Sequence, residues 1–357
     1  MPNLTALWFA GIVSCLVTPF VAMLMSRLGI MDNPKRKSRK IHRQPIPLGG
    51  GLAIFLTFFG LLFTAMALDL VTFTSVLRSQ LLAIFAGALV LIVGGLFDDA
   101  RELRPRYQII FPIIASLLAV AAGIAPQLVT NPLGGTINLN ELIPISASSL
   151  QGANIVLFFW LMGMMFTTKF LDGLDGLVAG MVGIGSVIIF LLTQQPAWFQ
   201  PEVGFLAQLL AGACLGFLIW NFHPAKIFLG EGGSLLTGYL LGAIAVISGS
   251  KIITTLLVMG VPAFDVARVI FNRLRQGKPI FVGDSEHLHF KMLESGLTQR
   301  QAVSVFYAIG FLFGISTLFL NNLFKLVAFA IIGLLLIILT WLLARKQPKI
   351  WVIWEKK

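Results

Sequence analysis

Two aspartates, Asp172 and Asp175, stand close together in the stretch TTKFLDGLDGLVAG (167–180), where an apolar segment begins. An ionised carboxylate at membrane depth is costly, so it is usually paired, solvated in a cavity or functional. One aspartate is explained as an N-cap of the following helix, because Asp favours the first turn and its dipole. Capping does not need both, and a spacing of three places two side chains on one helix face. The pair therefore predicts a polar site beside a helix end.

Other acidic residues also stand at the ends of apolar segments. Asp98 and Asp99 close one segment, and neighbouring helical residues project about 100° apart, so different roles are expected for them. Glu231 lies in LGEGGS, a glycine-rich stretch whose backbone N–H groups suit a phosphate, although such a stretch is more often a simple turn. His287 and His289 follow two further acids, at a spacing that works on an extended loop. No one of these groups identifies a site alone.

Taken together, the acids favour a hard cation. Carboxylates at a membrane edge suit Mg²⁺, which binds through one or two carboxylates plus substrate phosphates, and Mn²⁺ is a possible substitute. The chain has only two cysteines and four histidines, which argues against zinc. Cys15 and Cys214 lie in apolar stretches, where packing is expected rather than a disulfide. Basic neighbours of a Mg²⁺ site at a membrane point to phosphoryl transfer between a soluble and a lipid substrate.

The composition places these residues in a membrane protein. Of the 357 residues, 57% are hydrophobic and only 11% are charged, which is typical of a polytopic bundle of membrane-spanning helices. We expect an all-α fold in a single transmembrane catalytic domain, residues 1–357. The first span is expected to be an anchor, because it is too long for a signal peptide and lacks a small-residue cleavage site. Eleven spans are predicted, at 4–25, 48–68, 80–97, 108–126, 153–171, 176–193, 203–220, 234–249, 252–270, 303–320 and 323–343.

The basic residues predict the orientation of the spans. With the N-terminus outside and the C-terminus in the cytoplasm, all but three of the 26 lysines and arginines lie on the cytoplasmic side, as the positive-inside rule requires. The three exceptions are Arg78, Lys251 and Lys325. Topology therefore accounts for the net charge of +11, and we expect no nucleic-acid partner, while contact with anionic cytoplasmic lipids is compatible with it.

The same orientation gathers the acids at one face of the membrane. Of the 15 acidic residues, only Asp69, Glu141 and Glu202 are placed outside. Chain-distant acids on one side predict a single active site that faces the cytoplasm at the boundary of water and lipid. The loops expected to form it are 26–47, 98–107, 169–176, 221–233 and 271–302.

Five stretches, in order along the chain, resemble the polyprenyl-phosphate N-acetylhexosamine-1-phosphate transferases (glycosyltransferase family 4). The resemblance covers about residues 26 to 300, and five ordered matches are specific where any one would not be. The first and last resemble the UDP-GlcNAc branch more than the muramoyl-pentapeptide branch. The stretches are RKIHRQPIPLGGG (39–51), GLFDDARELRPR (95–106), FLDGLDGLVAG (170–180), NFHPAKIFLGEGGS (221–234) and VPAFDVARVIFNRLRQGKPIFVGDSEHLH (261–289).

The resemblance implies a reaction in the bacterial inner membrane. An N-acetylhexosamine 1-phosphate, first of all GlcNAc-1-phosphate, would pass from a UDP-sugar to undecaprenyl phosphate, releasing UMP as the first membrane step of a cell-envelope polysaccharide. Other donors remain open: UDP-GalNAc, UDP-QuiNAc-like sugars and UDP-MurNAc-pentapeptide. The polymer that is built also remains open, and a homodimer is a family expectation only.

The resemblance also implies roles for matching residues. Asp98 would deprotonate or orient the lipid phosphate, with Asp99 helping to hold the site. Asp172 would line the diphosphate region, and Glu231 would bind Mg²⁺. The other implied residues are Gly173, Leu174, Asp175, Asn221 and Phe228 for the uridine, His287 and His289 as catalytic residues near the sugar and phosphates, and Arg273 and Arg275 for the basic approach. His42 and Lys169 are further candidates for substrate binding.

Four positions depart from the family pattern. Glu231 stands for an Asp, Lys169 for an Asn, Gln108 for a Lys and Phe290 for a His. We hypothesise that Lys169 restores the positive charge that Gln108 lacks, which keeps a cation near the diphosphate. The departures leave open an altered donor sugar or a catalytically inactive scaffold.

Two other classes of membrane protein fit the sequence less well. A transporter or channel would place acids near the bilayer midplane on broken helices related by a repeat, whereas these acids lie at helix ends and no repeat is visible. A phosphotransferase acting on CDP-alcohols would carry Ala-Arg soon after its first Asp-Gly, and DGLDGLVAG lacks it. An enzyme of the resembled family is therefore the favoured interpretation.

Overall fold

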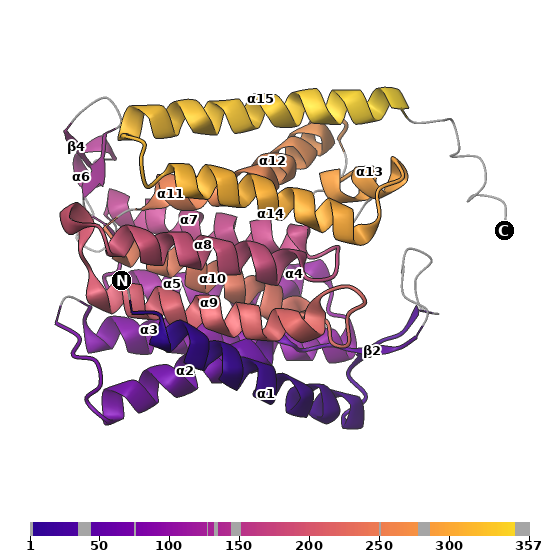
Figure 1. Cartoon of the computed structure of the whole chain (residues 1–357), viewed down its shortest axis with the longest axis horizontal. Helices are drawn as coiled ribbons and strands as arrows, with labels where there is room; N and C mark the ends of the chain where they lie inside the picture. Colours follow the sequence, from indigo (N-terminus) through magenta and orange to yellow (C-terminus); the bar gives the residue numbers. More distant parts are fainter. Residues whose placement is uncertain are drawn as a thin grey trace.

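The structure is a computed structural model that describes residues 3–34, 44–74, 76–126, 128–131, 135–143, 151–249, 251–277 and 286–346. Long helices run side by side along one axis, with α1 (Thr5–Arg27) and α2 (Gly51–Ala67) on one side and α15 (Asn322–Lys346) on the other (Figure 1). Two small antiparallel sheets of two strands each are the only strands in the described ranges. The predicted α-helical fold class is confirmed.

The remaining elements follow the predicted order of spans. The predicted span 108–126 corresponds to α5, with the short α4 just before it, and 252–270 corresponds to two helices, α11 and α12. The strands are β1 (Met31–Asp32), β2 (Ile46–Pro47), β3 (Leu128–Thr130) and β4 (Thr136–Asn138). The helices are α3 (Arg78–Arg101), α4 (Pro105–Gln108), α5 (Ile110–Ala121), α6 (Leu139–Leu142), α7 (Gly152–Leu171), α8 (Leu177–Thr193), α9 (Pro201–Asn221), α10 (Gly230–Ile247), α11 (Ile252–Val258), α12 (Gly260–Arg275), α13 (Leu288–Glu294) and α14 (Gln299–Ser316), with a 3₁₀ turn at Pro196–Trp198.

Several of these helices can cross a membrane by themselves. In the described part of the chain, six are long and apolar enough, and a seventh span is counted if the bent pair α11–α12 is one crossing. The six are α1, α3, α7, α9, α10 and α15. Three further apolar helices, α2, α4–α5 and α8, are shorter. The chain is therefore a multi-pass membrane protein.

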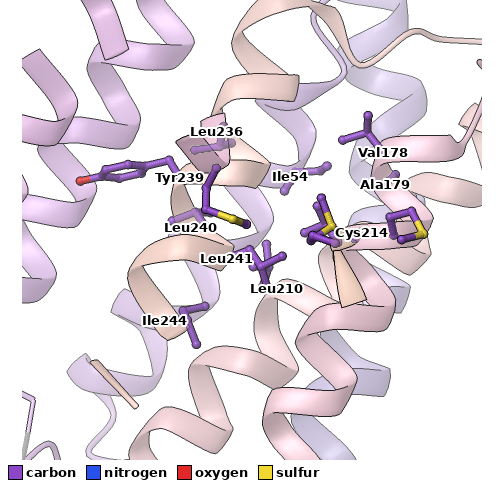
Figure 2. Packing of buried hydrophobic residues seen from close by; sticks show 14 of the residues in the cluster. Ile54, Val178, Ala179, Leu210, Cys214, Leu236, Tyr239, Leu240, Leu241 and Ile244 are labelled. Carbon is purple, nitrogen blue, oxygen red and sulfur yellow. The ribbon is translucent and has the colours of Figure 1, made fainter. Parts of the chain in front are cut away.

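Helix α10 is the centre of the bundle. It packs against α2, α3, α7, α8 and α9, and most of its residues are buried. In Figure 2, Leu241 of α10 lies next to Leu210 of α9, and the two helices are in contact. A helix that is apolar on all sides belongs in the core of a larger bundle. Both cysteines are free thiols, and Cys214 is buried in the core as its apolar surroundings predict.

Glycines allow α10 to approach its neighbours closely. A Cβ on Gly95 of α3 would overlap the backbone of Gly232, and a Cβ on Gly51 of α2 would overlap Gly233. Backbones can meet this closely only where neither residue has a side chain. The predicted C-terminal boundary of the loop 221–233 is therefore wrong. Helix α10 already begins at Gly230, and these glycines serve helix packing.

The span predicted as one continuous helix at 252–270 is broken. Helices α11 and α12 meet at an angle of 81°. Pro262 lies in the first turn of α12, and a proline ring cannot be accommodated against the carbonyl four residues earlier in a continuous helix. That carbonyl belongs to Val258, the last residue of α11, so the break follows from the proline.

Candidate active site

A cavity of about 380 Å³ opens at one end of the bundle. Helices α3 and α7 end there, α10 begins there, and the loop between α9 and α10 closes one side. Because acids at helix ends share this edge, residues far apart in the chain become neighbours. The residues of the sequence prediction that line the cavity are Asp98, Asp99, Lys169, Asp172, Gly173, Leu174, Asp175, Asn221, Phe228 and Glu231.

Lys169 is at the centre of a polar network in this cavity. Its ammonium forms an ion pair with Oε1 of Glu231 and donates a hydrogen bond of 3.0 Å to Oε1 of Gln108. The amide of Gln108 in turn donates to Oδ1 of Asp98, at 3.0 Å. The two departures from the family pattern, Lys169 and Gln108, are thus in direct contact and connect Asp98 to Glu231.

Asp98 and Asp99 differ in their surroundings, as their helical positions predict. Oδ1 of Asp98 also accepts the backbone N–H of Leu103 at 2.7 Å, so Asp98 is held at the end of α3. Oδ1 of Asp99 accepts the backbone N–H of Glu231 at 3.1 Å, which joins α3 to the start of α10. Oδ2 of Asp99 is buried and has no hydrogen-bond partner among the described residues.

The donor set suits Mg²⁺. Six carboxylates line this cavity, and those of Asp98, Asp99, Asp172 and Glu231 are among them. Oδ2 of Asp99 is a buried acceptor that still lacks a partner in the described chain. In the described ranges no three acidic, histidine or cysteine side chains converge closely enough to hold a metal alone. Mg²⁺ commonly binds through one or two carboxylates plus waters and substrate phosphates, so this arrangement fits it.

Asp172 follows the last residue of α7 and faces the open cavity. Burial within the bundle, and after it the negative charges of Glu231, Asp99 and Asp175, raise the pKa of this carboxyl. The side chain remains exposed to the cavity, and this limits the rise. A cation bound near Asp172 would favour the ionised form, because an opposite charge stabilises a carboxylate.

Asp175 and Asn221 organise the adjoining loops. Oδ2 of Asp175 lies 2.7 Å from Nδ1 of His223 and accepts the backbone N–H of Ala225 at 3.2 Å. The buried amide of Asn221 accepts the N–H of Gly176 at 3.1 Å and donates 2.9 Å to a carbonyl in the loop before α10. Both the oxygen and the nitrogen of the Asn221 amide are therefore hydrogen-bonded to backbone, which indicates that Asn221 positions these two loops.

The two predicted histidines lie behind the cavity wall. Their rings stack on each other, with centroids 5.6 Å apart and planes 7° apart. Neither His287 nor His289 is among the residues that line the cavity. A Cβ on Gly173 would overlap Nε2 of His289, so this glycine is needed where the two segments touch. Burial, and secondly the nearby His287, lower the pKa of His289 to about 3, so its ring is neutral.

Asp265 holds the histidine segment, and the predicted site did not include it. Its Oδ2 lies 2.9 Å from Nδ1 of His287 and accepts the backbone N–H of Leu288 at 3.0 Å, while its Oδ1 accepts from Arg268 at 2.7 Å. Because a carboxylate only accepts, Nδ1 of His287 is the donor. Asp265 and Arg268 stand three apart in a helix, a spacing that brings side chains together and was available in the sequence.

Some predicted residues do not reach the cavity. Arg273 is buried and Arg275 exposed, and neither lines it. His42 lies outside the described residues. The cavity also contains residues that the prediction did not include, among them Asp32, His223, Ser234, Phe290 and Gln299. His223 and Ser234 belong to the predicted motif at 221–234, and the other three lie in the predicted loops 26–47 and 271–302. Only the folding of the chain brings these side chains to the cavity.

Comparison with known proteins adds to this geometry. Glycosyl transferase family 4 matches residues 81–249, the part of the chain that supplies every acidic residue of the cavity except Asp32. The probable undecaprenyl-phosphate N-acetylglucosaminyl 1-phosphate transferase of Bacillus subtilis is 30% identical over 86% of this chain and 82% of its own length. The decaprenyl-phosphate N-acetylglucosaminephosphotransferase of Mycobacterium tuberculosis is 32% identical over 84% of this chain and 77% of its own.

A second branch is more distant. The phospho-N-acetylmuramoyl-pentapeptide-transferase of Prochlorococcus marinus is 27% identical, over 85% of this chain and 86% of its own length. The chain shares 30% or more identity with relatives across most of both lengths, and the family match covers the carboxylate-bearing helices. Together these findings are sufficient to assign the chain to a family. The chain belongs to glycosyl transferase family 4, among the polyprenyl-phosphate N-acetylhexosamine-1-phosphate transferases.

Proposed function

We propose that this protein transfers GlcNAc-1-phosphate from UDP-GlcNAc to undecaprenyl phosphate and releases UMP. The observation that carries the proposal is a cavity lined by carboxylates from chain-distant segments, in which the Lys169 ammonium pairs with Glu231. The activities named for the Bacillus and Mycobacterium relatives support the same reaction. We further propose that it is the first membrane step of a cell-envelope polysaccharide.

The proposed reaction is a single displacement at phosphorus. An oxygen of the lipid phosphate forms a bond to the β-phosphorus of the UDP-sugar, and the bond from that phosphorus to the bridging oxygen breaks. UMP then leaves with the bridging oxygen. Phosphoryl transfer of this kind depends on positioning and electrostatic stabilisation more than on covalent chemistry by the protein.

In this proposal Asp98 orients the lipid phosphate or removes its proton. The Gln108 amide and the Leu103 N–H, both bonded to Oδ1, would hold this carboxylate in one orientation. Lys169 lies on the other side of Gln108 and would place a positive charge near the diphosphate of the donor. The uridine would lie along Gly173, Leu174, Asp175 and Phe228, which line the cavity.

We assign Mg²⁺ binding to Glu231, with Asp99 and Asp172 beside it. When bound, Mg²⁺ supplies positive charge that neutralises the diphosphate and lets an anionic phosphate approach. Oδ2 of Asp99 supports this assignment, because a buried carboxylate oxygen without a donor in the described chain is available to a cation. Lys169 would orient Glu231 through their ion pair. Mn²⁺ is a possible substitute, since carboxylate and water ligands also suit it.

The proposal places the enzyme in the bacterial inner membrane. Eleven crossings, with the N-terminus outside and the C-terminus in the cytoplasm, would put the cavity on the cytoplasmic side, where UDP-sugars are made. The distribution of the basic residues supports this orientation. A homodimer remains a family expectation. A donor such as UDP-MurNAc-pentapeptide is the second candidate, which the Prochlorococcus relative supports at lower identity.

The proposal is tested with purified protein, undecaprenyl phosphate, Mg²⁺ and a panel of UDP-sugars, with UMP and the lipid product measured together. We expect product from UDP-GlcNAc, none without divalent cation, and a loss of about 100-fold or more in Asp98→Asn and in Glu231→Gln. Asp69→Asn, at the opposite end of the bundle, is the matched control and should keep full activity. Folded, lipid-bound protein that makes no product from any donor would contradict the proposal and favour an inactive scaffold.

A further inference from the structure

A second polar pocket lies at the end of the bundle opposite the active-site cavity. Helix α8 begins beside the cavity at Leu177 and ends at Thr193, and α10 begins there at Gly230 and ends at Ile247. The pocket adjoins the far ends of these helices and has a volume of about 40 Å³. Its walls include Leu192, Trp198, Gly249, Lys251, Thr254 and Lys325.

Two lysines in this pocket lack a counter-charge. Lys251 is only 8% exposed, and its ammonium donates to Oε1 of Gln200 at 3.2 Å. The Lys325 ammonium makes no hydrogen bond or ion pair within the described chain, and no carboxylate there pairs with either lysine. Burial, and then the charge of Lys325, lower the pKa of Lys251 to about 8. Buried charge that is not paired is unfavourable, so an anion would stabilise the pocket.

The sequence makes this pairing of lysines more significant. Only Arg78, Lys251 and Lys325 depart from the cytoplasmic placement of the basic residues, and two of these three line one small pocket. Arg78 is exposed at the start of α3 and is not part of the pocket. Basic residues are scarce on the outer side of a membrane protein. The presence of two lysines in one outer pocket therefore indicates a ligand of opposite charge.

We propose that this pocket binds a phosphate oxyanion at the outer face of the membrane, either from the head group of an anionic phospholipid or as free phosphate. Lysine is a common phosphate binder that acts as a point charge. The volume is sufficient for a few water-sized groups and thus for a small oxyanion. Trp198 is 44% exposed beside apolar Leu192, which resembles the aromatic residues that lie at head-group level in membranes.

The lipid source is tested with protein in nanodiscs of phosphatidylcholine alone or with phosphatidylglycerol. The unfolding temperature and the retained lipid, measured by native mass spectrometry, are compared for the wild type, Lys251→Gln, Lys325→Gln and the control Arg78→Gln. We expect phosphatidylglycerol to raise the unfolding temperature of the wild type and the control, and about tenfold weaker retention in either lysine variant. In phosphatidylcholine alone, the lysine variants should be at least as stable as the wild type, because each removes the repulsion between the Lys251 and Lys325 ammonium groups.

The free-phosphate source is tested by adding inorganic phosphate to the same proteins in phosphatidylcholine, against sodium chloride of equal ionic strength. Stabilisation by either probe that is lost in Lys325→Gln and kept in Arg78→Gln supports the proposal and identifies the source. Absence of stabilisation by both probes, or an equal response in all four proteins, overturns it. Lys325→Gln carries the test if Lys251→Gln does not fold, since Lys325 is the more accessible of the two. The measurements require no transferase activity, so they stand apart from the proposed function.

Discussion

Lys169 links the two ends of the polar network in the candidate active site. Through Gln108 it reaches Asp98, and through its ion pair it reaches Glu231. The hypothesis that Lys169 compensates for the charge missing at Gln108 requires the two side chains to be near each other, and they are in hydrogen-bond contact. Lys169 and Gln108 therefore form one linked pair in the cavity.

The first prediction concerns this pair. Lys169→Asn should reduce transferase activity by about tenfold to a hundredfold, because a charge-assisted contact near the diphosphate is lost, whereas Lys169→Arg should keep most of it. Adding Gln108→Lys to Lys169→Asn returns a cation to this region and should restore part of the activity. The measurement is UMP release at saturating donor, with Lys226→Asn as the control for loss of a cytoplasmic lysine. Equal activity of Lys169→Asn and Lys169→Arg would exclude the compensation.

The second prediction is a pH dependence of stability that arises from His289. Its folded pKa of about 3 lies below the ordinary value of about 6.5, so below pH 6.5 the unfolded chain binds a proton that the folded chain does not. The free energy of unfolding should thus fall by about 1 kcal/mol from this group between pH 6.5 and 5.5. In His289→Gln that part of the pH dependence should be missing. Thermal unfolding in detergent at several pH values measures it, and an identical pH slope in both proteins would contradict a buried, neutral His289.

At the scale of elements, the site depends on the approach of α3 and α10. Asp99 at the end of α3 accepts a hydrogen bond from the backbone N–H of Glu231 at the start of α10. The two helices can approach this closely because Gly95 and Gly232 have no side chains. The spacing of the acids is thus set by helix packing several residues away. A motif with acids and glycines together serves both the chemistry and the packing that positions it.

The third prediction tests this packing. Gly95→Ala should destabilise the protein by about 1–3 kcal/mol, because the new Cβ meets backbone that cannot move aside locally. Gly60→Ala in α2 is the matched control, since nothing lies within 4 Å of a Cβ there, and alanine favours a helix by about 0.5–1 kcal/mol. The unfolding temperatures of the two variants should therefore move in opposite directions. A similar temperature for both would show that the close approach of α3 and α10 is not required.

At the scale of the whole molecule, the bundle separates two polar regions. The cavity with its carboxylates lies at one end, and the lysine pocket lies at the other. Between them the central helix α10 is almost entirely buried in apolar contacts. The separation corresponds to the predicted orientation, in which acids meet cytoplasmic substrates and the few outer lysines face the opposite leaflet.

The fourth prediction tests the orientation directly. In a background of Cys15→Ala and Cys214→Ala, Arg104→Cys should be protected from a membrane-impermeant maleimide in spheroplasts, and Leu70→Cys should be labelled. Both positions are exposed, so access depends on the side of the membrane. After permeabilisation both should react, which controls for intrinsic reactivity. Labelling of Arg104→Cys alone in intact spheroplasts would reverse the proposed topology.

The amino-acid sequence was sufficient to predict the helical membrane class and most of the acids that line the cavity. Apolar length and the placement of charges act locally along the chain, so they identify helices and the ends that carry Asp98, Asp172 and Glu231. Five ordered motifs were sufficient to indicate the family. The break at Pro262 was visible in principle, since proline interrupts a helix wherever it stands.

The contacts between polar groups depend on the folded arrangement of the helices. Several contacts join residues that are distant in the chain. Lys169 contacts Gln108, Asp265 accepts a hydrogen bond from His287, and Lys251 and Lys325 line the same pocket. The glycines of α10 likewise proved to be packing residues once their neighbours were known. Contacts between distant segments depend on how whole helices pack, and helix packing depends on shape complementarity that no local pattern contains.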